Sequence, residues 1–175
     1  MKNVFLLILL SVVTLACTPV DNFDEDQAIN KIDTVMASYE LIDNDSEGLD
    51  GSIFVDLYYE NGKNLISFNA NGDSIIINTK NIKYSWMLSN FYFYKEIDFS
   101  SDSRFDSYSC TLEEHNKSLV GIEIKYKWLI VYAASNDKMI KIKVEENNTG
   151  ELRCWQIILD SGLFWFRINC EQPSL

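Results

Sequence analysis

Hydrophobic and polar residues alternate with a period of two along most of this chain, starting at Ser52. This period is typical of strands that bury one face. We predict strands over 52–60, 65–70, 74–79, 84–89, 91–97, 108–113, 120–125, 128–132, 139–145, 153–159 and 164–170. Short strands with turn signals about every 8 to 12 residues predict an all-β fold, either a sandwich or a barrel.

Turn residues separate several of these predicted strands. Asn61-Gly62 and Asn71-Gly72 are typical of tight hairpins, because both residues tolerate a left-handed backbone. A two-residue turn at Ser161-Gly162 would place Trp155 opposite Ile168 and gather apolar residues on one face.

Residues 17–51 differ from the rest in pattern and charge. Ile29, Ile32, Met36 and Tyr39 recur at helical spacing, which predicts a short helix over 24–39. The acidic segment 43–51 is predicted to be a solvated loop. It resembles the start of a calcium loop, but position twelve is Phe54 instead of the expected Glu.

The N-terminus has the features of an export signal. A positively charged start is followed by an apolar run, Val4 to Ala16, that is shorter than the roughly 20 residues of a membrane-spanning helix. We therefore interpret residues 1–16 as a signal peptide. Thr14 to Cys17 resembles the bacterial lipobox, which implies a lipidated Cys17 and an anchor in the outer membrane. An ordinary secretory signal is the alternative.

The acidic residues after Cys17 resemble the surface-export signal of Bacteroidota lipoproteins. That resemblance implies a cell-surface location. A solvated acidic tether explains the same residues equally well. Residues 17–51 are therefore predicted to be a tether between the membrane and a domain that starts at Ser52.

Composition excludes several classes of protein. The chain is 47% hydrophobic and 13% aromatic, which excludes wholesale disorder. Its net charge of -11 argues against a nucleic-acid partner, since phosphate binding needs clustered Lys and Arg. His115 is the only histidine and lies in a polar segment, where we expect an exposed side chain. We therefore predict no metal centre, no cofactor and no enzymatic activity.

Three further cysteines follow Cys17 in the chain. Export permits a disulfide, but Cys110, Cys154 and Cys170 leave one thiol over. The predicted hairpin register puts Cys154 and Cys170 on opposite faces, which argues against a bond between them.

Aromatic residues supply the candidate ligand site. In Phe91 to Tyr94, alternation buries either the two Phe or the two Tyr. Sugar-binding sites place aromatic faces against pyranose rings. The candidate site is an exposed platform made by Tyr92, Tyr94, Tyr108 and Tyr126. The alternative is that these are ordinary strand aromatics. We expect Trp86 and Trp128 in the core.

The last third of the chain resembles a known family. The segment from Lys141 to Arg153 contains a sequence similar to the pattern Asn-Thr-x-Gly-x-x-Arg. An alternating strand follows it, and the final strand ends at Gln172. Together with Ser67 to Ile77, Trp86 and Trp128, this pattern resembles the BACON domain (Bacteroidetes-associated carbohydrate-binding often N-terminal). The resemblance implies an immunoglobulin-like β-sandwich over 52–175 with an insertion near 90–120.

Two functions are compatible with this resemblance. The first is a non-catalytic cell-envelope lipoprotein that binds carbohydrate through aromatic residues of the insertion. The alternative is a structural or protein-interaction component of an envelope complex without glycan binding. The first predicts exposed, roughly coplanar Tyr side chains, and the second predicts an exposed apolar patch or an unpaired edge strand.

Overall fold

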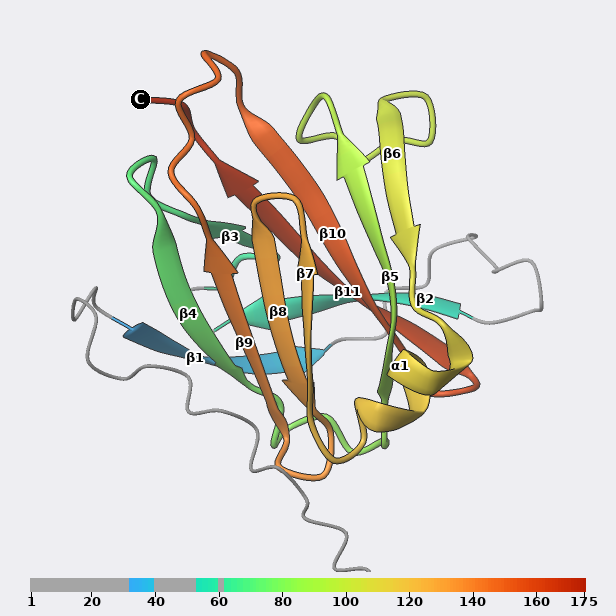
Figure 1. Ribbon diagram of the computed structural model, residues 1–175. Helices are drawn as coiled ribbons and strands as arrows, with labels where there is room; N and C mark the ends of the chain where they lie inside the picture. Colours follow the sequence, from blue (N-terminus) through green and yellow to red (C-terminus); the bar gives the residue numbers. More distant parts are fainter. Residues whose placement is uncertain (1–31, 40–52, 60–61) are drawn as a thin grey trace, which may run out of the picture.

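The computed structural model describes residues 32–39, as backbone, together with residues 53–59 and 62–175. The all-β prediction is confirmed, because strands make up nearly all the regular structure of these residues (Figure 1). The strands are β1 (Ile32–Tyr39), β2 (Ile53–Tyr59), β3 (Leu65–Ser67), β4 (Asp73–Asn78), β5 (Met87–Tyr94), β6 (Arg104–Ser109), β7 (Ile122–Tyr126), β8 (Leu129–Ala134), β9 (Met139–Val144), β10 (Arg153–Asp160) and β11 (Phe164–Gln172). One short helix, α1 (Leu112–Lys117), joins β6 to β7.

The strands form two sheets that β1 connects. The first sheet has the order β6-β5-β10-β11, and β2 and β3 both pair in parallel with successive parts of β11. The second sheet has the order β1-β4-β9-β8-β7. Ile32 to Met36 of β1 pair with β4, and Ala37 to Tyr39 then pair with β2. One continuous strand therefore passes from one sheet to the other.

The core lies between the inner faces of the two sheets. Its largest fully buried side chains are aromatic: Trp86, Trp155, Phe91, Phe93 and Phe166. The prediction that Trp86 lies in the core is confirmed, and its indole Nε1 donates a hydrogen bond of 3.2 Å to Thr79 Oγ1. The buried indole thus keeps a partner for its N–H group.

Strand β10 is buried on both faces. All six residues from Cys154 to Leu159 are buried, although alternate side chains point to opposite sides of the sheet. The inner side chains join the core. On the outer face, the segment that follows β5 folds back, so that the Phe99 ring lies 5.3 Å from the Tyr94 ring.

The helix predicted over 24–39 is wrong for the part that the structure describes, because 32–39 form β1. Ile32, Thr34 and Val35 are β-branched and favour a strand. β1 also gains hydrogen bonds from neighbours on both sides, which the helical spacing did not predict. β1 lies ahead of the expected domain start at Ser52.

Neither Asn-Gly turn joins two strands of a hairpin, which corrects that prediction. β2 and β3 both pair with β11, and β4 pairs with β1 and β9. The backbone at position 72 still favours glycine, because its φ of 92° lies in the left-handed region. A Cβ there would lie 3.1 Å from the Val144 carbonyl oxygen.

The β10–β11 hairpin forms, but with a register shifted by two residues. Trp155 lies opposite Cys170 instead of Ile168. A shift of two keeps every side chain on its predicted face. Cys154 lies opposite Glu171, and Cys110, Cys154 and Cys170 are all free thiols.

Two segments near α1 also differ from the predictions. One strand, β5, replaces the two predicted over 84–89 and 91–97, with a bulge near Ser89. α1 replaces the end of the predicted strand 108–113 and the polar segment after it. The half-buried His115 contacts the Leu88 carbonyl oxygen through Nδ1 at 3.0 Å, so its predicted exposure is wrong. Thr111 and Glu114 form a capping box at the start of α1.

The described part of the chain contains no helix that is long and apolar enough to cross a bilayer. Residues 1–16, Cys17 and the acidic segment 43–51 lie outside the residues that the structure describes.

Candidate functional site

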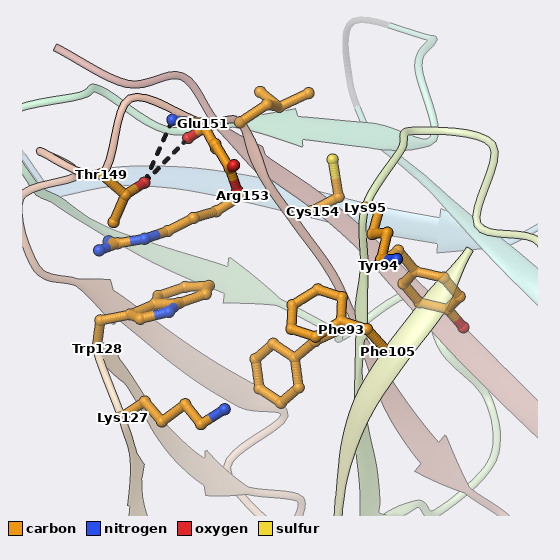
Figure 2. A pocket seen from close by; sticks show the side chains of 11 residues that line it. Phe93, Tyr94, Lys95, Phe105, Lys127, Trp128, Thr149, Glu151, Arg153 and Cys154 are labelled. Carbon is orange, nitrogen blue, oxygen red and sulfur yellow. Dashed lines mark hydrogen bonds between the residues drawn. The ribbon is translucent and has the colours of Figure 1, made fainter.

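A pocket of about 720 Å³ opens at one end of the two sheets, where three connections meet (Figure 2). We call it the end pocket. Its aromatic walls are Phe93, Phe105 and Trp128. The polar and charged side chains in its lining are Lys95, Lys127, Thr149, Glu151 and Arg153, and Tyr94, Leu152 and Cys154 complete the lining. The residues come from the end of β5, the start of β6, the β7–β8 turn and the β9–β10 connection.

Trp128 forms the central wall of the end pocket. Its ring makes edge contacts with Trp155 at 5.0 Å and with Phe93 at 5.8 Å. The Arg153 guanidinium lies over its face at 4.5 Å (Figure 2). The prediction that Trp128 belongs to the core holds only in part, since the side chain is half-buried and packs against the core from the pocket.

The β7–β8 hairpin puts Trp128 in this place. Tyr126 pairs with Leu129, so Lys127 and Trp128 form a two-residue turn with a left-handed backbone at Lys127. Such a turn projects both side chains from the tip of the hairpin. Lys127 forms an ion pair with Asp106 on β6.

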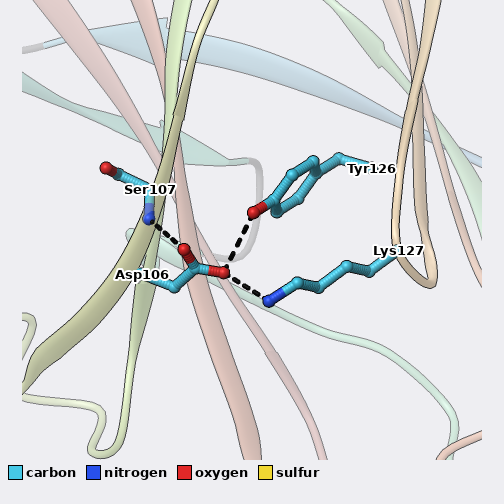
Figure 3. Close-up of polar contacts among 4 residues, drawn as sticks. All are labelled: Asp106, Ser107, Tyr126 and Lys127. Carbon is cyan, nitrogen blue, oxygen red and sulfur yellow. Dashed lines mark hydrogen bonds and ion pairs between the residues drawn. The ribbon is translucent and has the colours of Figure 1, made fainter.

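Asp106 ties the two sheets together beside the pocket (Figure 3). It accepts hydrogen bonds from Lys127 and, at 3.1 Å, from the Tyr126 hydroxyl, and its other oxygen accepts from the Ser107 N–H. The hydrogen bond from Lys127 is the main reason that the pKa of Asp106 is lowered, and the same bond raises the pKa of Lys127. Both groups are therefore charged at neutral pH.

A buried asparagine holds the β9–β10 connection that forms the top of the pocket. Asn147 is fully buried, and its Nδ2 donates to the carbonyl oxygens of Glu151, Gln172 and Pro173 at 2.8, 3.2 and 3.1 Å. Its Oδ1 accepts from the Thr149 hydroxyl at 2.7 Å. These bonds fix a turn that would otherwise leave buried carbonyl oxygens unsatisfied.

Arg153 belongs to the same network. Its Nη1 donates to the Glu145 carbonyl oxygen at 3.1 Å and to the side-chain oxygen Oε1 of Gln172 at 3.0 Å. Burial lowers the pKa of Arg153. The guanidinium nevertheless stays positively charged, because arginine side chains are not deprotonated in proteins. The network holds the guanidinium flat against Trp128.

The four candidate tyrosines do not form a single platform. The Phe91 and Phe93 side chains enter the core, so Tyr92 and Tyr94 point to the outer face of the sheet. Tyr94 is buried, and its pKa is raised to about 12, mainly by burial. Tyr92 is half-buried, with the Arg104 guanidinium 4.8 Å from its ring.

Tyr108 and Tyr126 lie together on the other side, where β6 faces β7. Their rings are 5.1 Å apart, and Tyr108 also stacks on Phe91. The Tyr108 hydroxyl donates to Glu114 Oε1 at 2.7 Å, which raises the pKa of Tyr108 to about 12 and lowers that of Glu114. Both rings are partly covered by the core. The expectation of one exposed, coplanar platform is therefore wrong, and ligand binding by these tyrosines stays a prediction.

A second hollow lies on the outer face of the first sheet, and we call it the outer groove. It has a volume of about 300 Å³ and is lined mainly by polar groups: Asp56, Asn64, Asp98, Gln156, Arg167 and Asn169. Most of these groups bind one another. Gln156 accepts from the Tyr94 hydroxyl at 2.6 Å and donates to Asn169 at 2.8 Å, and Arg167 pairs with Asp56 at 2.7 Å.

Sequence reasoning missed the pocket residues that do not belong to a periodic pattern. Phe105 lies at a bulge between β5 and β6 and is 59% exposed, although a phenylalanine in a strand is expected to be buried. Lys127 and Trp128 sit on a turn of two residues without Gly or Asn. The available signal for this turn was the interval of two residues between two strongly alternating segments, 122–126 and 129–134.

The described residues contain no group of three or more His, Cys, Asp or Glu side chains that could hold a metal ion. No family model matches the chain, and no curated protein does so. Among solved structures, the chain is similar to an NMR structure of a protein from Bacteroides thetaiotaomicron. The two are 16% identical with a TM-score of 0.43, and the match covers 63% of this chain and 76% of the other.

Proposed function

We propose that this chain is a non-catalytic cell-envelope lipoprotein of a Bacteroidota species, and that its end pocket binds carbohydrate. The observation that carries the proposal is the grouping of the exposed Phe105 ring and the half-buried Trp128 ring beside hydrogen-bonding groups in one open pocket, with the buried Phe93 packed behind them. Aromatic rings contact the apolar faces of sugars, while polar groups select among hydroxyl positions. The proposed site thus moves from the four tyrosines to the end pocket.

The proposed fold family is an immunoglobulin-like, BACON-like β-sandwich. The two sheets with a shared core support it. The turn from Asn147 to Arg153 also supports it, because both of these residues donate hydrogen bonds to Gln172. The proposed anchor is a lipid on Cys17, which would place the chain in the outer membrane and, with the acidic residues that follow, on the cell surface.

A glycan array tests the binding proposal. The full chain is applied in a polyoxyethylene detergent, because maltoside detergents carry sugars themselves. We expect saturable binding to a subset of glycans, and a loss of about tenfold or more in a Phe105→Ser variant, because stacking on an exposed ring contributes about 1 to 2 kcal/mol.

Leu163→Ser is the matched control for this experiment, since it removes an apolar side chain that is even more exposed than Phe105 from the β10–β11 turn, outside the pocket lining. It should bind as the unchanged chain does. Equal binding by both variants would refute the end pocket as the site, and an array without any bound glycan would refute the proposed function.

One observation favours the alternative, a structural or protein-interaction component of an envelope complex. Ile53, Tyr84 and Leu163 are 39%, 41% and 72% exposed. They are neighbours, because the Ile53 N–H donates to the Leu163 carbonyl oxygen and the Tyr84 ring lies 5.0 Å from Phe164. A photo-crosslinker at Leu163 that yields one stoichiometric protein adduct in cells, with no glycan bound on the array, would favour this alternative.

A further inference from the structure

The end pocket concentrates positive charge on a strongly acidic protein. The chain carries a net charge of -11, yet three cationic side chains line this pocket, Lys95, Lys127 and Arg153. The lining contains a single carboxylate, that of Glu151. The local excess of positive charge opposes the net charge of the molecule, so an anion would be attracted to this pocket more than to the surface around it.

Two of the three cations retain unused hydrogen-bond donors. Within the described residues, Lys95 is exposed and its ammonium has no hydrogen bond or ion pair. Arg153 uses only Nη1 in its bonds to Glu145 and Gln172, which leaves Nη2 and Nε for another acceptor. Lys127 is different, because Asp106 already neutralises it.

Arg153 is also held in place before any ligand arrives. Its contact with Trp128 at 4.5 Å and its two hydrogen bonds fix the plane of the guanidinium (Figure 2). A fixed guanidinium with free donors binds a carboxylate or a sulfate through charge-assisted bonds and loses little conformational entropy. An aromatic wall beside it provides the surface for a sugar ring.

We propose that the end pocket takes an acidic saccharide, with a ring carboxylate or sulfate between Arg153 and Lys95 and the sugar face against the aromatic wall. This inference rests on the proposed carbohydrate function and adds the chemical class of the ligand. The uncharged aromatic contacts would supply general sugar affinity, and the two cations would supply the selection for acidic sugars.

The test is an array of matched pairs, with the full chain in the same polyoxyethylene detergent. Each uronate-containing glycan is printed beside its carboxyl-reduced form, and each sulfated glycan beside its desulfated form. We expect the acidic member of at least one pair to bind about tenfold more tightly than its neutral form. In Lys95→Gln this preference should fall about fivefold, and added salt should weaken it further.

Lys80→Gln is the control, because Lys80 is also exposed but does not line the end pocket. It should retain the preference. If neutral and acidic members bind equally, and Lys95→Gln changes nothing, the inference is overturned while the carbohydrate function stands. If no glycan binds, both fail. Far-ultraviolet circular dichroism of each variant verifies that the sheets remain folded.

Discussion

Tyr94 lines the end pocket, and its hydroxyl donates to Gln156 in the lining of the outer groove. The two hollows differ in how their polar groups are used. In the outer groove, most polar side chains are already paired, as in the Tyr94–Gln156–Asn169 chain of hydrogen bonds. In the end pocket, Lys95 and part of Arg153 have no partner among the described residues. What distinguishes the two hollows is therefore the pairing of their polar side chains and not only their volume.

The difference indicates which hollow serves stability and which serves binding. Polar groups that satisfy one another in a buried network hold the sheet and its covering segment in one arrangement. Polar groups that keep free donors in an open pocket can bind an acceptor in exchange for water, without breaking a hydrogen bond within the protein. Substitutions in the groove should therefore lower stability, whereas substitutions of the free groups in the pocket should lower binding.

The largest effect is expected for Asn147, whose network shapes the end pocket. Asn147→Ala removes the donor that satisfies three carbonyl oxygens and should lower the free energy of unfolding by about 2 to 4 kcal/mol. The midpoint of urea unfolding measures this loss. Asn148→Ala is the matched control, because Asn148 is exposed, and it should change stability by less than about 0.5 kcal/mol. Equal effects would contradict the assigned role of Asn147.

The sequence predicted which face of a strand is buried more readily than which strand lies beside it. The alternation in Phe91 to Tyr94 reduces the choice to two arrangements, and the structure has the two Phe in the core. Pairing depends on contacts between distant segments. The two Asn-Gly pairs therefore did not identify the hydrogen-bonded partners of β2, β3 and β4. β2 and β3 even run in the same direction, since both pair in parallel with β11.

The candidate site was harder to predict for a related reason. Tyr92 and Tyr108 were grouped because they are aromatic and near in sequence, but they lie on opposite faces of their sheet. The end pocket draws on four segments between Phe93 and Cys154, and its exposed Phe105 depends on a bulge. A period of two carries no information about where a bulge falls. The Thr111–Glu114 capping box, in contrast, was a local signal for α1 that the sequence did contain.

A smaller loss of stability is expected when the outer network loses one bond. Tyr94→Phe removes the hydroxyl that Gln156 Oε1 accepts from at 2.6 Å, at a cost of about 1 to 2 kcal/mol. Tyr92→Phe is the control on the same face of the same strand, and it should be close to neutral. Urea unfolding of both variants gives the comparison. A larger loss of stability in Tyr92→Phe than in Tyr94→Phe would contradict a structural role for the outer groove.

The smallest effect concerns Asp106, at the junction of the two sheets. Because its pKa is lowered in the folded state, mainly by Lys127, its ionised form stabilises the fold. That contribution is complete above the ordinary aspartate pKa of 3.8 and is lost as pH falls through the lower folded value. Asp106→Asn should therefore cost less than about 1 kcal/mol at pH 7, and the difference from the unchanged chain should vanish below that value.

The same substitution probes the end pocket from the opposite direction. Without the Asp106 carboxylate, Lys127 has no ion-pair partner and becomes a third free cation beside the aromatic wall. Asp106→Asn should then bind an acidic saccharide more tightly while the fold becomes slightly less stable. Asp137→Asn removes an exposed carboxylate that does not line the pocket, and it should change neither quantity. Weaker binding by Asp106→Asn would mean that the position of Lys127 matters more than its charge.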